Sequence, residues 1–297
     1  MILVAGATGM LGSEVCRRLR ARNHAVRGLV RPASPKEPAL REIGVEVSSG
    51  DLRSRVDVEA ACRGVSTVIS TATAMGSKDK SLTLRDIDRD AQLRLVEVAK
   101  ASGVEHFIYV SLSPNLQPSA PLVRYKREVE RAVRASGMRW TILQPSVFME
   151  IWLSGLLGWD FDRGRAMIFG AGSAPISWIS VADVAEYVIR SLDDPRLANR
   201  DVPIGGPEAL SPNAVMKIFE NVSGRRYTAK HLPRSVLSLL SPAVGMFNEG
   251  AASGMSLGAQ TALGDVIESP LQRELAVPLT TVHAYAMRVA GTPITPA

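Results

Sequence analysis

A glycine-spaced turn near the start of the chain, in the run ILVAGATGMLGSEV, is the feature that most limits what this sequence can fold into. Gly6, Gly9 and Gly12 directly follow a short apolar run and open a segment with helical periodicity. In this context the glycines let the backbone approach a diphosphate closely, and the start of the helix offers free N–H groups and positive potential. The turn therefore predicts a dinucleotide-binding strand–turn–helix unit. A glycine-rich turn that binds nothing is the alternative.

Short apolar runs alternate with helix-period segments through the first half of the chain. This alternation is typical of βαβ units and a parallel sheet, and the nearly continuous apolar character of the runs predicts strands buried on both faces. We expect an α/β fold with a doubly wound parallel Rossmann sheet, whose ligands bind beyond the carboxyl ends of the strands. The expected strands cover residues 1–6, 24–31, 45–52, 65–72, 106–112 and 140–145.

The pattern changes after Pro145. We expect an apolar lid-like segment there, then a short hairpin, a helix that begins near Ser180, a further helix over 212–224 and a strand over 226–232. Residues 1–147 are predicted to form the cofactor-binding core. Residues 148–297 are predicted to form mainly a small α/β cap and substrate region, and a return of some segments to the core is left open.

Composition narrows the classes of protein that remain. The chain of 297 residues is 46% hydrophobic and 22% charged, as in an ordinary globular protein, and its net charge of +6 comes from arginines spread along the sequence. Neither a nucleic-acid partner nor a metal is expected, since Cys16 and Cys62 are isolated. The apolar runs are too short for a membrane span, and a strand that starts at Ile2 leaves no room for a signal peptide. The protein is expected to be cytoplasmic. A homodimer or a protein partner stays open.

Residues at the ends of the second, third and fourth expected strands suggest which dinucleotide binds. Arg31 stands where an NAD-specific site would place an acidic residue, and a guanidinium suits a 2′-phosphate, so NADP(H) is favoured over NAD(H). Ser34 and Lys36 could assist. Asp51 could accept a hydrogen bond from the adenine amino group or cap the next helix. The small residues of STATAM, from position 70, leave room for ribose and nicotinamide.

These pieces, together with YVSLS, Lys126 in RYKREVERAVR and the run PISWISVADVAEYV, resemble the NmrA-like branch of the atypical short-chain dehydrogenase/reductases. The resemblance covers nearly the whole chain. It implies an NADP-binding Rossmann domain with a small cap, in a family that mixes reductases with members that only sense NADP(H). It also implies that Lys126 is directed at the ribose and nicotinamide, although Lys126 lies in a charged helix whose apolar stripe explains the pattern equally well.

The complete set of predicted site residues follows from these arguments. Ser111 ends the fifth strand, where it could hydrogen-bond the substrate or the ribose or simply form the turn. Apolar residues after the sixth strand are expected where substrate enters, with plain core packing as the alternative. The predicted cofactor-binding residues are Gly6, Thr8, Gly9, Met10, Leu11, Gly12, Arg31, Asp51, Leu52, Thr71, Ala72, Thr73, Ser111, Lys126, Pro145 and Val147. The predicted catalytic residue is Lys126, and the predicted substrate-contacting residues are Tyr125, Met149, Trp152 and Trp178.

The sequence departs from typical short-chain reductases at one functional position. Those enzymes carry Tyr-x-x-x-Lys, in which the tyrosine is the proton donor, but position 122 is Leu122. Loss of a positioned general acid typically costs about 10²–10⁴ in rate. We therefore expect an NADP(H)-dependent oxidoreductase that transfers hydride to a small or medium apolar acceptor, such as a quinone, an enone or an aromatic carbonyl, without that pair. A non-catalytic NADP(H)-sensing regulator or assembly factor is the alternative.

Overall fold

A computed structural model of the protein describes residues 1–77, 79 and 81–290, and the chain divides into two compact units. Unit 1 contains Met1–Leu112, Pro121–Gln144 and Val184–Val202. Unit 2 contains Ser113–Ala120, Pro145–Asp183 and the chain from Pro203 onward. Within the described ranges, no helix is both long and apolar enough to cross a membrane.

Unit 1 is built on a seven-stranded sheet in the order β3-β2-β1-β4-β5-β6-β9. The neighbours from β3 to β6 pair in parallel, as near-continuous apolar strands predict. The doubly wound α/β fold expected from the sequence is confirmed. The strands are β1 (Ile2–Ala5), β2 (Val26–Val30), β3 (Glu46–Ser49), β4 (Thr67–Ser70), β5 (His106–Val110), β6 (Arg139–Pro145) and β9 (Arg200–Ile204).

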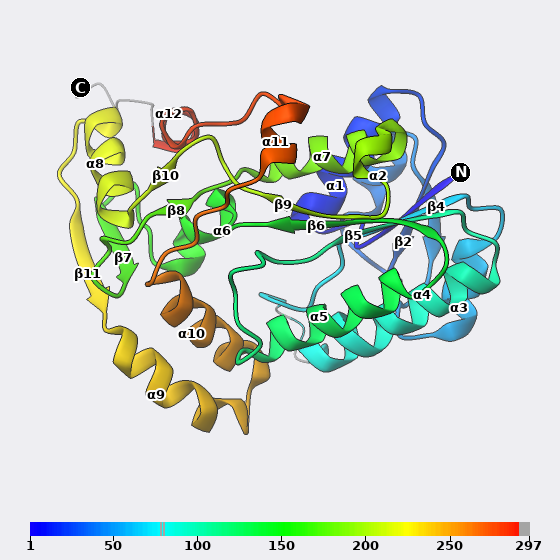
Figure 1. Ribbon diagram of the computed structural model, residues 1–297, viewed down its shortest axis with the longest axis horizontal. Helices are drawn as coiled ribbons and strands as arrows, with labels where there is room; N and C mark the ends of the chain where they lie inside the picture. The colour runs from blue at the N-terminus through cyan, green and yellow to red at the C-terminus, as the bar shows by residue number, and fades with distance from the viewer. Residues whose placement is uncertain (78, 80, 291–297) are drawn as a thin grey trace. The chain divides into compact units, whose positions relative to one another are not determined.

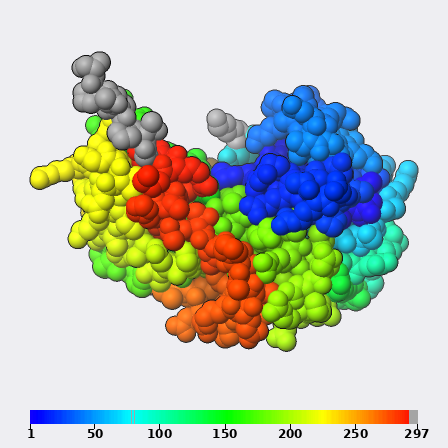
Figure 2. Space-filling view, turned by 90° about the horizontal axis from the view of Figure 1, so that it is seen from above, coloured from blue at the N-terminus to red at the C-terminus, as the bar shows by residue number. Residues whose placement is uncertain are grey.

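Helices cover both faces of this sheet. Figure 1 shows α3, α4 and α5 on one face, and α1 and α7 on the other. In Figure 2 the blue surface of the N-terminal part of the chain faces the viewer. Apolar side chains of the strands and of α3 to α5 form a core that includes Leu3, Leu95 and Phe107. The helices are α1 (Met10–Ala21), α2 (Glu37–Glu42), α3 (Arg55–Cys62), the π-helix η1 (Arg85–Ala91), α4 (Gln92–Ala101), α5 (Pro121–Arg134), α7 (Val181–Asp193) and η3 (Pro195–Leu197).

The strand order reverses between β1 and β4. The chain winds from β1 outward to β3 and then returns to place β4 on the other side of β1. In doubly wound sheets the crevice at such a switch point is where ligands bind. The Thr71 N–H donates to the Ala5 carbonyl at 3.0 Å, so the segment after β4 lies directly beside the turn after β1.

Unit 2 combines helices with two small sheets around an aromatic core. Phe219 packs against Trp159, Phe161, Tyr227 and Tyr285 in this core. The elements are α6 (Met149–Trp152), η2 (Gly155–Leu157), β7 (Arg165–Phe169), β8 (Ile176–Ser177), β10 (Ala209–Leu210), α8 (Pro212–Ser223), β11 (Thr228–Leu232), α9 (Arg234–Gly245), α10 (Glu249–Thr261), α11 (Pro270–Leu275) and α12 (Val282–Ala290).

Before Ser180, the predicted short hairpin is present only as an antiparallel bridge between Asp160 and Arg165, and it does not join β7 to β8. The two strands exist, but β7 pairs in parallel with β11, and β8 pairs antiparallel with β10. Between β7 and β8, Gly170 and Gly172 both adopt positive φ and turn the chain without pairing the two strands that flank them. The helix over 212–224 and the strand over 226–232 are present as α8 and β11.

Candidate functional site

The turn between β1 and α1 needs two of its three glycines for its own packing. Gly6 has φ +86°, a conformation that L side chains rarely adopt. A Cβ on Gly12 would lie well inside contact distance of the Gly6 carbonyl oxygen and 2.7 Å from its carbon. These two glycines therefore allow the strand, the turn and the helix to pack closely, whatever the turn binds.

Gly9 is under a weaker internal constraint. A Cβ at this position would meet the Gly6 oxygen at 3.1 Å and nothing closer, and Gly9 is exposed. It is the N-cap of α1, and α1 has neither a side-chain cap nor an acidic residue in its first turn. The first N–H groups of a helix have no acceptors within the helix, so this end of α1 is open to an anion.

Two basic side chains flank the turn. Arg31 follows β2, and its Nη1 lies 2.8 Å from Asp79 Oδ2 in a half-exposed ion pair. Lys36 Nζ donates to the Thr8 carbonyl at 2.9 Å, which joins the loop after β2 to the glycine turn. Lys36 therefore adds positive potential beside the amino terminus of α1, whereas the charge of Arg31 is balanced by Asp79.

Asp51 follows β3 and is engaged by a neighbour that the sequence reasoning missed. Arg53 Nη2 lies 2.8 Å from Asp51 Oδ2, and this hydrogen-bonded pairing is the main cause that lowers the pKa of Asp51. The N-cap of α3 is Ser54, whose hydroxyl accepts from the Asp57 N–H, so Asp51 does not cap that helix. Leu52 packs in the core of unit 1.

The segment after β4 is fixed by buried polar side chains. The Thr71 hydroxyl donates to the Ala5 carbonyl at 3.2 Å. Gln92 Nε2 donates to the Ala72 carbonyl at 3.1 Å, and the Ala74 N–H donates to Asp88 Oδ2 at 2.9 Å. Asp88 lies in the π-helix η1, a rare conformation that is frequent at functional sites.

Lys126 belongs to α5, and its side chain lies against β5 inside unit 1, with only 5% of its surface exposed. Its Nζ donates to the Val110 carbonyl at 3.2 Å, lies 3.9 Å from Asp88 Oδ1 and stands 5.0 Å from the centre of the Tyr109 ring. Burial lowers the pKa of Lys126, and the charges of Asp88 and Glu130 oppose that shift. Burial is also the main cause that raises the pKa of Asp88.

Ser111 belongs to a second polar group centred on Glu130, which the sequence did not reveal. The Ser111 hydroxyl donates to Glu130 Oε1 at 2.6 Å, and the same oxygen accepts from Gln144 Nε2 at 3.1 Å. Arg127 and Arg134 form ion pairs with Glu130 at 2.5 and 3.1 Å. Although burial pushes the pKa of Glu130 up, these donors outweigh it and the pKa is lowered. Ser111 therefore has only acceptor capacity left for a ligand.

The predicted substrate residues are largely buried within their own units. Met149 and Trp178 belong to the core of unit 2, and Trp178 Nε1 donates to the Leu210 carbonyl at 2.8 Å. Trp152 is half-buried and meets Phe169 edge to face. Tyr125 is buried on α5 in unit 1. Pro145 and Val147 begin the second segment of unit 2. Their roles toward a ligand stay predictions.

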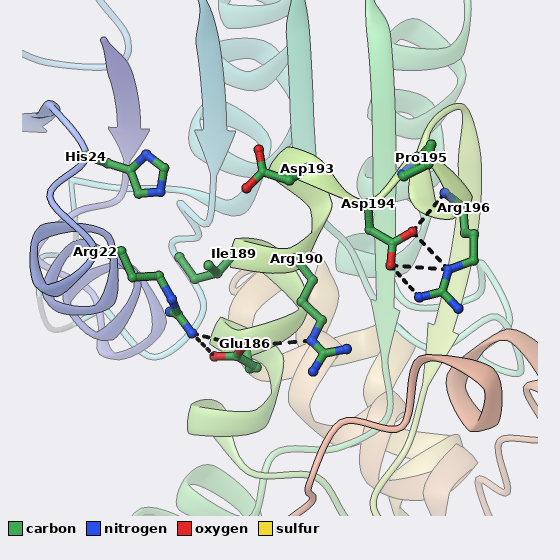
Figure 3. Close-up of a pocket in the computed structure, with 9 residues that line it drawn as sticks. All are labelled: Arg22, His24, Glu186, Ile189, Arg190, Asp193, Asp194, Pro195 and Arg196. Atoms are coloured by element: carbon green, nitrogen blue, oxygen red, sulfur yellow. Dashed lines mark hydrogen bonds and ion pairs between the residues drawn. The ribbon is translucent and has the colours of Figure 1, made fainter.

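A separate hollow of about 650 Å³ lies at the other end of α1, in unit 1 (Figure 3). Its charged side chains pair with one another: Arg22 with Glu186 at 2.9 Å, and Arg196 with Asp194 at 2.6 Å. It contains none of the predicted site residues. We therefore place the candidate site at the glycine turn. In the described part of the chain, no group of three or more His, Cys, Asp or Glu side chains is arranged to hold a metal ion.

A parallel doubly wound sheet with a glycine turn at its switch point defines the Rossmann class of dinucleotide-binding folds. Within that class, residues 1–285 match the model of the NmrA-like family, and the chain belongs to this family.

Proteins that are similar to this chain in sequence have different named roles. The chain is 33% identical over 236 residues to the NAD(P)H azoreductase of Xenophilus azovorans, with 77% of each chain covered. It is 27% identical over 244 residues to the photosystem II assembly factor Ycf39 of Synechocystis, with 80% of this chain and 72% of that protein covered.

Solved structures show the same fold. The NADPH-dependent quinone oxidoreductase QOR2 of Escherichia coli, in complex with NADPH, has a TM-score of 0.78 at 21% identity. The match covers 97% of this chain and 99% of that one. The Citrobacter triphenylmethane reductase in complex with NADP(H) has a TM-score of 0.77 at 20% identity, with the same coverage.

Proposed function

We propose that the protein is an NADP(H)-dependent oxidoreductase that reduces a small or medium apolar acceptor, such as a quinone, an enone or an aromatic carbonyl. The observation that carries this proposal is the open amino terminus of α1 behind Gly9, with Arg31 and Lys36 beside it. Relatives named as an NAD(P)H azoreductase and as NADPH-dependent or NADP(H)-bound reductases support the same chemistry.

The chain's residues fit such a cofactor. The N–H groups of residues 9–12 would hold the diphosphate, because Gly9 leaves its approach free. Arg31 and Lys36 would hold the 2′-phosphate, and the backbone of residues 71–73 would lie against the ribose and nicotinamide. Lys126 would also hold the ribose. The bound cofactor supplies a hydride to the acceptor.

Lys126 is the proposed proton donor, because the usual tyrosine position is Leu122. The acceptor gains a hydride and one proton from the Lys126 ammonium, and the resulting amine regains its proton from water. Tyr109 does not replace the missing tyrosine in this scheme, since its hydroxyl is buried under Lys126 and makes no hydrogen bond in the described structure.

Cofactor preference tests this proposal directly. We expect the wild-type protein to bind NADPH at least about fivefold more tightly than NADH, because an ion pair with the 2′-phosphate is worth about 1 kcal/mol or more. Arg31→Ala should lower the preference, since only Lys36 then remains for the 2′-phosphate, and leave NADH affinity unchanged. Arg17→Ala removes an exposed arginine on α1 and should change neither. Calorimetric titration with both nucleotides measures this. Equal affinities in the wild-type protein would refute the 2′-phosphate site.

The second candidate is an NADP(H)-binding assembly or regulatory factor without turnover. The relatives named as photosystem II assembly factor Ycf39 favour it. So does the apolar surface of α9 and the turn after it, where Leu239 is 79% and Phe247 89% exposed. Exposed apolar side chains of this size are typical of protein-docking surfaces.

Turnover distinguishes the two candidates. With a panel of quinones and enones, the oxidoreductase should consume NADPH, and Lys126→Met should lower kcat/KM at least about tenfold because it removes the proton donor. Absorbance at the NADPH band gives the rate, and a thermal melt controls for loss of folding. NADPH binding without consumption across the whole panel would favour the assembly factor over the enzyme.

A further inference from the structure

The Asp88 side chain faces both the segment after β4 and Lys126 in the candidate site. Its Oδ2 accepts from the Ala74 N–H at 2.9 Å, in the segment after β4. Its Oδ1 faces Lys126 Nζ at 3.9 Å. One carboxylate therefore links the proposed ribose and nicotinamide segment to the proposed proton donor.

The Asp88 carboxylate is buried with an incomplete set of hydrogen bonds, which is unusual for a buried group. Asp88 is completely buried, and its Oδ1 has no hydrogen-bond partner among the described residues. Buried charges normally pair closely and saturate their hydrogen bonds. The Asp88–Lys126 pair is instead about 1 Å longer than a direct hydrogen bond, so neither charge is fully satisfied.

The other groups around Lys126 are also defined. β5 contributes the Val110 carbonyl, which accepts from Nζ, and the face of the Tyr109 ring. α5 contributes Glu130, whose charge favours the ammonium, and Arg127, whose charge opposes it. The Tyr109 hydroxyl has no partner and is uncharged, because burial raises its pKa well above the usual value. Asp88 is thus the one carboxylate within ion-pair distance of Nζ in the described structure.

The position of Asp88 in η1 explains how it reaches both partners. A π-helical turn carries an extra residue, which rotates the side chains that follow it. Here Asp88 and Gln92, one turn apart, both point into unit 1 toward the segment after β4. Asp86, in the same π-helix, stays half-exposed.

We propose that Asp88 is a positioning residue for the reaction: it fixes the segment after β4 through Ala74 and keeps Lys126 charged beside β5. This inference rests on the proposed function, in which Lys126 gives a proton. Asp88 itself touches neither cofactor nor substrate in this scheme. It determines whether the ammonium that donates the proton exists at the working pH.

Asp88→Asn separates the two roles. The amide oxygen can still accept from the Ala74 N–H, while the negative charge is lost and an N–H donor faces Lys126. We expect the titration midpoint of Lys126 to fall by at least about one pH unit, since a charge about 4 Å away inside a protein has an effect of this order. Asp86→Asn is the matched control and should leave the midpoint unchanged.

The readout does not need turnover. Lysine labelled with ¹³C at Cε reports the charge on Nζ by NMR, and the Lys126 signal is assigned by its loss in Lys126→Arg. In the wild-type protein the signal should be that of an ammonium at pH 7. A neutral Lys126 at pH 7 in the wild-type protein would overturn the proposal without any variant, as would an Asp88→Asn midpoint within about 0.3 unit of wild type.

Enzyme assays then connect the pair to the reaction. The alkaline limb of kcat/KM should move down with the NMR midpoint in Asp88→Asn, while NADPH affinity at pH 6 changes less than about threefold. If the NMR midpoint of Lys126 falls in Asp88→Asn but the alkaline limb of kcat/KM stays in place, the positioning role is overturned. If the wild-type protein shows the ammonium but neither binds nor consumes NADPH, the proposed function fails while the charge assignment of the pair stands.

Discussion

Two different constraints explain the three glycines of the turn after β1. Gly6 and Gly12 are required by the backbone itself, through a positive φ and a close approach of α1 to Gly6. At Gly9 the backbone conformation suits any residue, with φ −72° and ψ 167°, and a Cβ would meet one atom at 3.1 Å. A ligand against the first turn of α1 explains this glycine better than packing does.

Alanine substitutions separate these constraints. We expect Gly9→Ala to lower the free energy of unfolding by less than about 1 kcal/mol, the usual cost of a poorer N-cap, and to weaken NADPH binding at least about tenfold. Gly12→Ala should cost about 2 kcal/mol or more, because its Cβ would meet backbone atoms that cannot move aside. Thermal or urea unfolding and NADPH titration of both variants measure the two effects.

The contrast between the two variants is the test. A Gly9→Ala protein that folds normally and binds NADPH as tightly as wild type would show that the turn does not hold the diphosphate. A Gly12→Ala protein as stable as wild type would show that the close approach of α1 to Gly6 is relaxed at little cost.

At the level of elements, the sequence predicted β1 to β6 of unit 1 well because their signal is local, but it missed the seventh strand, β9 (Arg200–Ile204). β1, β4 and β5 are short apolar runs followed by a glycine, a threonine and a serine, and β5 lies within two residues of its predicted range. The pairing of β7 was not predictable in this way. Its partner β11 lies about sixty residues further along the chain, and nothing near β7 indicates it.

In the candidate site, too, residues with a local sequence signal were predicted and residues without one were missed. The glycine turn and Arg31 were predicted to bind the cofactor because each directly follows an expected strand. Asp88, Arg53 and Glu130 were missed, since charged residues in a helical segment usually face solvent. The four-residue spacing of Ile87 and Ala91 is typical of one buried helix face, and both are buried. It gave no sign that a π-helical turn would bury Asp88 beside them.

At the level of the whole molecule, the sheet unit is completed by a segment far along the chain. Val184–Val202 belongs to unit 1, and it contributes most of α7 together with the start of β9. Thr141 Oγ1 donates to the Leu197 carbonyl at 2.9 Å, and Arg18 pairs with Glu186 at 2.8 Å. The predicted core of residues 1–147 gains these partners from a later segment, and the sequence analysis left open that such segments return to the core.

Fragments test where this core ends. Residues 1–147 alone should give no cooperative thermal transition, because β6 becomes an unpaired edge and the apolar residues under α7 are exposed. The same fragment joined through a glycine–serine linker to residues 181–204 should regain the transition. If that fragment also binds NADPH within about tenfold of the full chain, the diphosphate and 2′-phosphate sites lie wholly in unit 1. A cooperative transition in 1–147 alone would instead show that α7 and β9 are dispensable for folding.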